Sequence, residues 1–378
     1  MRPASLGANA TTPWGAPLQN RSRAAVAAML VVLAIPATAG AATKPVQLGL
    51  PASSQKTFQN KYGSDVNAYF PAKTTIHVGD SVKFSTAGEF HTVDIPARGS
   101  SAAAFIVPSG QTAAGANDAA GNPFWFNGQP TLRFNPIVLK SLFGKSVSYT
   151  GAKRIESGAP LANKIKPMTV KFTKAGTYTY FCDIHPGMKG SVKVVSKSSS
   201  VPSAASDKAA VKRQLAADQK TAAKLPKTIV PAGTVSVGGS GPGGVEYYGM
   251  LPGTVTVKTG STLTFQMSAA SYEDHTATFG PGNPEDPKQS GTYLGKLAQT
   301  FNGPGPFDPI ATYPSDPAGT PATLNPTLHG NGFWNSGVLD RTSATPLPPS
   351  GRVTFDTPGT YDFYCLIHPF MHGKVVVQ

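Results

Sequence analysis

The 378-residue chain is rich in glycine (40) and proline (35), and only 14% of its residues are charged. This composition argues against long helices over most of the chain, and a hydrophobic content of 40% argues against intrinsic disorder. The formal net charge of +14 favours an acidic partner or an anionic surface, but no nucleic-acid-binding motif accompanies it, so binding to DNA or RNA is not expected.

The N-terminal segment has the features of a secretory signal peptide. Arg21 and Arg23 precede the apolar run AAVAAMLVVLAIPA, which is too short to span a bilayer, and small residues suited to signal-peptidase cleavage follow it. A buried helix is the alternative, but the run lacks a polar face. We therefore predict that residues 1–42 direct export to the periplasm, the cell envelope or the medium. No transmembrane anchor is expected.

Several motifs occur twice in the same order, which indicates an internal repeat. The stretch HVGDSVKF at 77–84 resembles KTGSTLTF at 258–265. Likewise, FHTVDIP at 90–96 resembles DHTATFGP at 274–281. The spacing between the paired motifs is nearly constant, so we expect two copies of one domain.

Each copy is expected to be a β domain. Runs such as MTVKF and TYTYF, and later TLTFQ and RVTFD, alternate with the period of half-buried strands, and Gly and Pro separate them. We predict a first domain over residues 44–196, a linker over 197–228 and a second domain over 229–378.

The linker contains the Ala- and Lys-rich stretch SDKAAVKRQLAADQKTAAKLP, which predicts a short amphipathic helix. Ser206 or Asp207 is the expected N-cap, and Pro226 ends the stretch. One face of this helix carries Val211, Leu215, Ala222 and Leu225. A disordered linker is the alternative.

Each copy also contains a long irregular segment, at about 97–165 and 280–350. Loops of this length are usually functional or disordered. The aromatic motifs NPFWFNG and NGFWNSG indicate that at least part of each segment packs against other structure.

Both cysteines of the chain lie in the same motif. Residues 178–190 read YTYFCDIHPGMKG and residues 361–373 read YDFYCLIHPFMHG, so that two residues separate Cys from His and His from Met. Thiolate, imidazole and thioether form a soft ligand set that selects copper, and two His, one Cys and a weak axial Met make the blue-copper electron-transfer site. A strand that ends at the cysteine, followed by a tight turn with proline, would direct His and Met back toward the sulfur.

One loop supplies three ligands, so a fourth must come from elsewhere. His91 and His275 are the candidates, because each occupies an equivalent place in its repeat, within the segment HT(V/A). A Cys182–Cys365 disulfide is the alternative, because cysteines of exported proteins often form disulfides. Cysteines at equivalent positions in two repeats, however, rarely lie close enough to form a disulfide. Haem attachment would need C-x-x-C-H, and zinc rarely recruits methionine.

Both copies resemble cupredoxins of the plastocyanin/azurin family, and the second is most similar to the amicyanins in its HPFM-x-GKVVV ending. The resemblance implies an all-β fold in which each domain is an eight-stranded Greek-key β-sandwich. It implies two type 1 copper sites with the ligands His91, Cys182, His185 and Met188, and His275, Cys365, His368 and Met371. Many family members brace the cysteine loop with an Asn directly before the first histidine, and here Phe90 and Asp274 replace it.

The expected function is electron transfer by a blue copper protein without catalysis of its own. The expected partner is a redox protein, and an acidic one would suit the positive charge of the chain. The resemblance also implies that electrons pass through the ring edge of the loop histidine, beside Phe370 in the second domain. A copper oxidase or nitrite reductase is one alternative. Such an enzyme needs His-x-His pairs and a histidine next to the cysteine, which are absent here. A copper storage, delivery or sensing protein is the other alternative.

Overall fold

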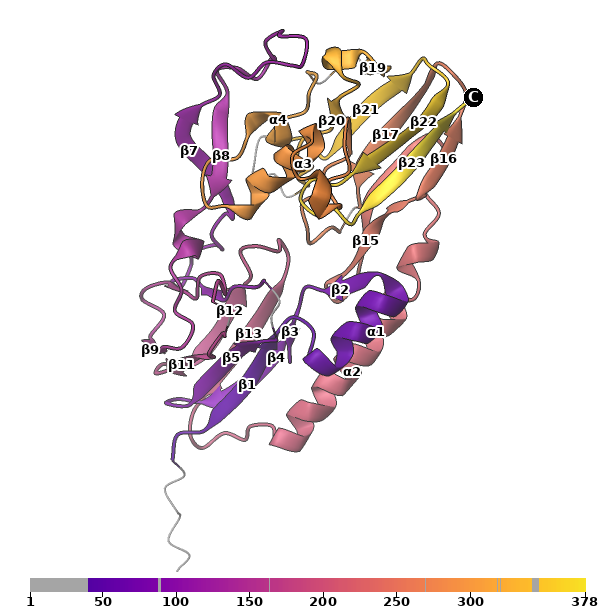
Figure 1. The fold of residues 1–378 in the computed structure, drawn as a ribbon. Helices are drawn as coiled ribbons and strands as arrows, with labels where there is room; N and C mark the ends of the chain where they lie inside the picture. The colour runs from indigo at the N-terminus through magenta and orange to yellow at the C-terminus, as the bar shows by residue number, and fades with distance from the viewer. Residues whose placement is uncertain are drawn as a thin grey trace, which may run out of the picture. The chain divides into compact units, whose positions relative to one another are not determined.

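The computed structural model describes residues 40–87, 90–162, 164–268, 270–317, 319, 321–341 and 347–378. The predicted signal peptide therefore lies almost entirely outside the described residues. The described chain is mostly β-sheet with few helices, as the sequence predicts (Figure 1).

Two five-stranded sheets enclose the core of the N-terminal half. One sheet has the order β3 (Tyr69–Phe70), β1 (Thr43–Leu48), β5 (Ser81–Thr86), β11 (Met168–Phe172) and β9 (Ser146–Tyr149). The other has the order β10 (Ile155–Glu156), β6 (Asp94–Ile95), β12 (Gly176–Phe181), β13 (Lys189–Val195) and β4 (Lys73–His77). Alternate residues of both sheets, such as Phe84 and Val192, are buried in one cluster, as the period-two pattern predicts.

The C-terminal half has a second pair of sheets around its own core. A six-stranded sheet has the order β19 (Ala322–Leu324), β21 (Ser350–Phe355), β17 (Ser261–Met267), β14 (Thr234–Gly241), β15 (Val245–Leu251) and β2 (Ser64–Val66). A five-stranded sheet has the order β16 (Thr254–Val257), β23 (His372–Val377), β22 (Gly359–Tyr364), β18 (Thr278–Phe279) and β20 (Trp334–Asn335). Phe265 and Phe363, from opposite sheets, are fully buried in the shared core.

The hairpins that lead to the two cysteines have the same register. In β12–β13, Tyr180 lies opposite Gly190, and in β22–β23, Phe363 lies opposite Gly373. A Cβ atom on either glycine would lie 2.4 Å from the ring of its partner. Glycine at these positions thus lets a buried aromatic ring lie across the neighbouring strand.

The two long irregular segments pack against each other. The first contributes the hairpin of β7 (Ile106–Thr112) and β8 (Pro130–Phe134), and the second contributes α3 (Tyr293–Ala298) and α4 (Pro309–Thr312). Their apolar side chains form a third hydrophobic core. The Trp125 indole N–H donates to the Pro314 carbonyl at 2.9 Å. These segments therefore join the two halves.

Two longer helices form a fourth cluster with β2 and lie side by side in Figure 1. Helix α2 (Ala204–Ala222) is the predicted linker helix, and the predicted apolar face packs into this cluster. Its N-cap is Ser203 rather than the expected Ser206 or Asp207. Helix α1 (Ala52–Tyr62) was not predicted, because it buries only Phe58 and so lacks a clear apolar stripe.

The halves are interleaved through β2. This strand belongs to the N-terminal half of the sequence, yet it pairs antiparallel with β15 at the edge of the C-terminal sheet. Residues 41–378 accordingly cluster as one compact unit. The remaining helices are short: η1 (Pro136–Leu139), η2 (Leu225–Lys227), η3 (Pro287–Gln289), η4 (Gln299–Asn302) and η5 (Leu328–Gly330). Across the described residues, every helix is too short or too polar to cross a bilayer.

The close approach at Gly373 leads to a stability prediction. We expect Gly373→Ala to lower the free energy of unfolding by about 1–3 kcal/mol, because the new methyl group would collide with the buried Phe363 ring. Urea unfolding followed by circular dichroism measures this change. Gly303→Ala is the control, since a Cβ there meets no atom within 4 Å. Equal midpoints for the two variants would contradict the packing described here.

Candidate metal centres

The loop from cysteine to methionine is closed in the same way in both halves. Cys182 directly follows β12, and its N–H donates to the Met188 carbonyl at 3.0 Å. The Met188 N–H in turn donates to the His185 carbonyl at 3.0 Å. The corresponding distances from Cys365 to Met371 and from Met371 to His368 are 2.9 and 2.8 Å. These bonds turn the chain so tightly that the cysteine and histidine side chains converge.

Site 1 brings together His91, Cys182 and His185, three of the four predicted ligands. The Nδ1 atoms of His91 and His185 lie 2.9 Å apart. The Cys182 Sγ lies 3.3 Å from Nδ1 of His185 and 4.0 Å from Nδ1 of His91. Met188 is buried in the same hydrophobic core as Cys182.

Site 2 brings together His275, Cys365 and His368 with more even spacing. The two Nδ1 atoms lie 3.2 Å apart, and each lies 3.9 Å from the Cys365 Sγ. Donor atoms that each lie about 2.0–2.3 Å from one metal ion are separated from one another by distances similar to those in site 2. The donor set of site 2 therefore fits a single bound ion. Met371 is buried in the same core as Cys365.

The electrostatics of both sites favour the thiolate, which is the form of cysteine that binds metal. Burial raises the pKa of the Cys182 thiol, but His185 and His91 outweigh this effect and hold the pKa well below its usual range. The pKa of Cys365 is lowered in the same way by His275 and His368. Each site thus offers one anionic sulfur and two imidazole nitrogens, a donor set suited to copper.

A threonine braces each cysteine. The Thr92 N–H donates to the Cys182 Sγ at 3.4 Å, and the Thr92 hydroxyl accepts from the Asp183 N–H at 2.8 Å. Thr276 makes the same two contacts with Cys365 and Leu366, at 3.4 and 2.8 Å. This role was not predicted, although the His-Thr dipeptide that both repeats share was its signal. The threonines brace the cysteine loops from the position after the first histidine.

The outer nitrogen of His275 faces a carboxylate. Its Nε2 lies 3.5 Å from Glu246 Oε1, and both side chains are fully buried. Gly238, at a bulge of β14 with φ +80°, makes room for the ring, since a Cβ there would lie 2.7 Å from Nε2. A carboxylate on the outer nitrogen orients the ring and leaves Nδ1 for a metal.

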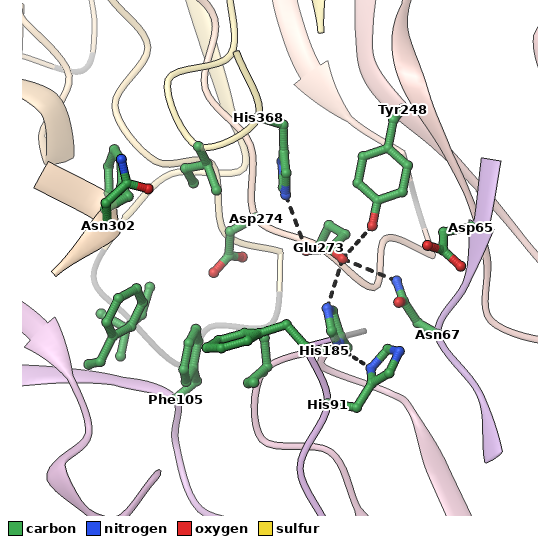
Figure 2. Close-up of a pocket in the computed structure, with 16 residues that line it drawn as sticks. Asp65, Asn67, His91, Phe105, His185, Tyr248, Glu273, Asp274, Asn302 and His368 are labelled. Carbon is green, nitrogen blue, oxygen red and sulfur yellow. Dashed lines mark hydrogen bonds and ion pairs between the residues drawn. The ribbon is translucent and has the colours of Figure 1, made fainter. Parts of the chain in front are cut away.

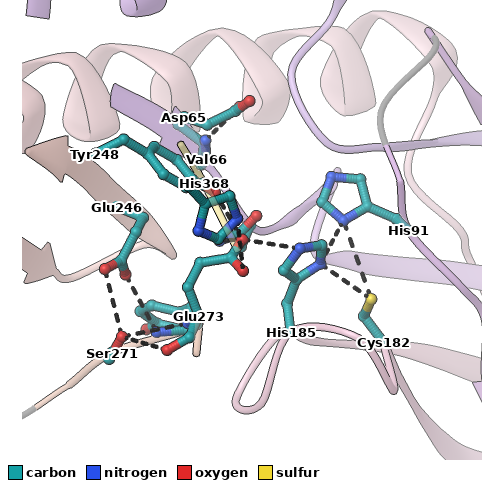
Figure 3. Close-up of polar contacts among 12 residues, drawn as sticks. Asp65, Val66, His91, Cys182, His185, Glu246, Tyr248, Ser271, Glu273 and His368 are labelled. Atoms are coloured by element: carbon teal, nitrogen blue, oxygen red, sulfur yellow. Dashed lines mark hydrogen bonds and ion pairs between the residues drawn. The ribbon is translucent and has the colours of Figure 1, made fainter. Parts of the chain in front are cut away.

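The outer nitrogens of both loop histidines face Glu273 (Figure 3). His185 Nε2 lies 2.9 Å from Oε1 of this carboxylate, and His368 Nε2 lies 3.9 Å from Oε2. Tyr248 also donates to Oε1, at 2.6 Å. Glu273 was not predicted, because its contact with His185 joins residues from the two halves of the chain.

A cavity of about 310 Å³ adjoins this carboxylate (Figure 2). Histidines of both sites line it, together with apolar side chains that include Phe105 and Ile367. Only 8% of the His185 side chain is exposed, so its outer edge faces the protein interior and this cavity more than bulk solvent. The edge of His368 is more accessible, with 19% of its side chain exposed.

Three buried carboxyl groups form a further cluster beside site 1: Asp94, Glu156 and Asp183. Burial and the proximity of the neighbouring carboxyls raise the pKa of Asp94 and Glu156 to about 7 and that of Asp183 to about 9. Arg154 pairs with Asp94 at 2.5 Å. Burial and mutual repulsion therefore disfavour ionisation of all three carboxyls at once.

The remaining histidines have partners of their own. His77 contacts Asp80 and Ser199, and His372 lies 3.3 Å from Glu285. His329 lies between Asp118 and Asp316, at 3.4 and 3.3 Å. These contacts are those of structural or surface residues.

Comparison with known proteins identifies part of the chain. Residues 148–195, which include Cys182, His185 and Met188, match the family described as copper binding proteins, plastocyanin/azurin family. A stretch of 26 residues is 65% identical to amicyanin-alpha of Methylorubrum extorquens. That stretch is 7% of this chain and spans only 22% of the length of the relative.

Solved cupredoxin structures also align with the chain. The oxidised plastocyanin of Dryopteris crassirhizoma matches at 20% identity and a TM-score of 0.20, over 38% of this chain and 99% of that one. A mutant amicyanin in its reduced Cu(I) form at pH 4 matches at 17% identity and a TM-score of 0.19, over 41% of this chain and 90% of that one. The family match thus covers the cysteine loop of site 1 and the two strands that flank it, β12 and β13.

Proposed function

We propose that the chain is an exported electron carrier that holds copper in two type 1 sites. The observation that carries this proposal is the pair of matched donor sets, each with one thiolate and two imidazole nitrogens at the end of a β-hairpin. Met188 and Met371, at the far ends of the two loops, would supply the weak axial thioethers of such a site.

The proposal includes two tandem cupredoxin domains, residues 44–196 and 229–378, with 197–228 as the linker. Matching strand pairs support it. The pairs β1–β5 and β4–β13 are parallel in the first half, as are β14–β17 and β16–β23 in the second. The cysteine hairpins also share their register.

Bound copper would supply reversible one-electron exchange between Cu(I) and Cu(II). The chain contributes a cage that its own contacts hold in place. Backbone hydrogen bonds fix the loops, Thr92 and Thr276 donate to the sulfurs, and carboxylates face the outer nitrogens of His185 and His275. Such a cage limits rearrangement between the two oxidation states, which favours fast electron exchange.

Two alternatives have weaker support. Storage, delivery or sensing of copper requires release, whereas a buried cage of four ligands retains its metal. An oxidase or nitrite reductase requires a histidine next to the cysteine, but the neighbours here are Phe181, Asp183, Tyr364 and Leu366.

The partner that we propose is a redox protein, attracted by the positive charge of the chain, which persists after loss of residues 1–42. Export is inferred from that N-terminal segment alone. An exposed apolar residue suited to docking lies beside site 2, since Phe370 is 56% exposed and its ring centre lies 6.0 Å from that of His368.

The first prediction concerns colour and stoichiometry. The oxidised protein is expected to be intensely blue with two coppers per chain, because a copper–thiolate bond gives strong visible absorption. Cys365→Ser should remove about half of the absorbance, since separate sites contribute additively. Cys182→Ser is the matched control, and each variant should keep one copper. Copper-loaded protein without colour, or loss of all colour in either variant, would rule out two type 1 sites.

The second prediction is that the copper-replete protein does not turn over oxygen or nitrite, because the sequence lacks the His-x-His pairs and the histidine next to a cysteine that such enzymes use. The assay supplies a reduced dye with either oxidant and follows dye oxidation over many turnovers. Sustained turnover that disappears on mutation of His77, His329 or His372 would reveal a catalytic copper and refute the carrier function.

The third prediction concerns docking. Phe370→Glu should slow electron exchange with the physiological partner severalfold while the visible spectrum stays the same, because a charge would interrupt the apolar contact beside His368. Ile229→Glu, which alters a residue that is 95% exposed and outside both sites, is the control. Equal exchange rates for the two variants would exclude this docking surface.

A further inference from the structure

Glu273 contacts a histidine of each site through a different carboxylate oxygen. Its Oε1 lies 2.9 Å from His185 Nε2 of site 1, and its Oε2 lies 3.9 Å from His368 Nε2 of site 2. Figure 2 shows the carboxylate between the two rings. The Glu273 side chain is buried.

The carboxylate is held in place by neighbours from separate parts of the chain. Tyr248 of β15 donates to Oε1 at 2.6 Å, and Asn67, which follows β2, donates to the same oxygen at 3.2 Å. The Glu273 carbonyl accepts from the Ser271 hydroxyl at 2.8 Å. Glu273 is also only two residues from His275, a candidate ligand of site 2. Its position is therefore determined by both halves at once.

The charge of Glu273 is shared by both sites. Three donors face its Oε1: His185 Nε2, the Tyr248 hydroxyl and the Asn67 amide, an arrangement suited to a carboxylate. A buried negative charge beside two ligand histidines stabilises the more positive, oxidised state of each site.

We propose that Glu273 couples the two sites, so that electrons pass between them inside the chain through His185, Glu273 and His368. This inference rests on the copper sites proposed above. One site is oxidised as the other is reduced, so the chain keeps the same number of electrons and no outside reagent takes part.

The exposure of the two histidines indicates why such a path is useful. The His185 side chain is 8% exposed and its outer edge faces Glu273, whereas the His368 side chain is 19% exposed and adjoins a surface pocket with Phe370. A partner protein therefore reaches site 2 more readily than site 1. Exchange through Glu273 lets site 1 gain and lose electrons by way of site 2.

The test measures exchange inside the chain directly. A flash-generated donor delivers less than one electron per oxidised chain, and the visible spectrum then follows redistribution between the sites. Cys182→Ser and Cys365→Ser provide the spectrum of each single site and cannot show redistribution. We expect a first-order phase in the native protein whose rate does not depend on protein concentration. Glu273→Ala should slow this phase at least tenfold with both coppers retained.

Glu285→Gln is the matched control, because it removes a carboxylate from a half-exposed position that contacts only His372 among the histidines. Its exchange rate should equal that of the native protein. An unchanged rate in copper-replete Glu273→Ala would overturn the coupling role and leave the proposed function intact. Absence of blue copper from the native protein would instead overturn the proposed function, and the coupling with it.

Glu273→Gln gives a second readout that does not depend on the alanine variant folding. Glutamine keeps the size of the side chain and an oxygen that can accept from Tyr248, but it removes the charge. The reduction potentials of both sites should therefore rise in this variant, whereas those of Glu285→Gln should not. A rise at only one site, or at neither, would contradict a charge shared between the two.

Discussion

The structure depends most on the register of two hairpins, β12–β13 and β22–β23. In each, one strand ends directly before the cysteine and the next begins directly after the methionine, so the paired strands fix the length of the loop between them. The cysteine N–H and the methionine N–H then close the loop on itself. Because the loop is closed in this way, the Cys-x-x-His-x-x-Met spacing brings the cysteine sulfur close to the histidine Nδ1. The aromatic ring that lies over Gly190 or Gly373 anchors the hairpin in its core.

A second constraint comes from the burial of charge. Each ligand set combines a thiolate with imidazoles in the protein interior, where an uncompensated charge would be strongly unfavourable. Glu246 and Glu273 lie against the outer nitrogens of His275 and His185, and Tyr248 and Asn67 donate to Glu273. Asn67 directly follows β2, so the pairing of that strand with the C-terminal sheet places Asn67 where it donates to Glu273. The structure thus connects the packing of the two halves to the surroundings of both loop histidines.

The sequence predicts local features well. Alternating strands, the helix at 204–222 and the convergence of cysteine with two histidines follow from periodicity and from the repeated motifs. It does not predict that β2 pairs across the halves, that the two long segments share a core, or that Glu273 lies between the sites. Each of these depends on contacts between residues far apart in the chain, for which one sequence carries no local signal. Thr92 and Thr276 could be predicted only in part. The repeated His-Thr dipeptide can be found in the sequence, but the contact of the threonine with the cysteine sulfur cannot.

The most direct test of the account is a crystal structure of the copper-loaded protein with anomalous scattering recorded at the copper edge. The account predicts two copper peaks per chain. One should lie among Nδ1 of His91, Nδ1 of His185 and Sγ of Cys182, and the other among the corresponding atoms of His275, His368 and Cys365. A single peak, or copper bound away from these atoms, would contradict it.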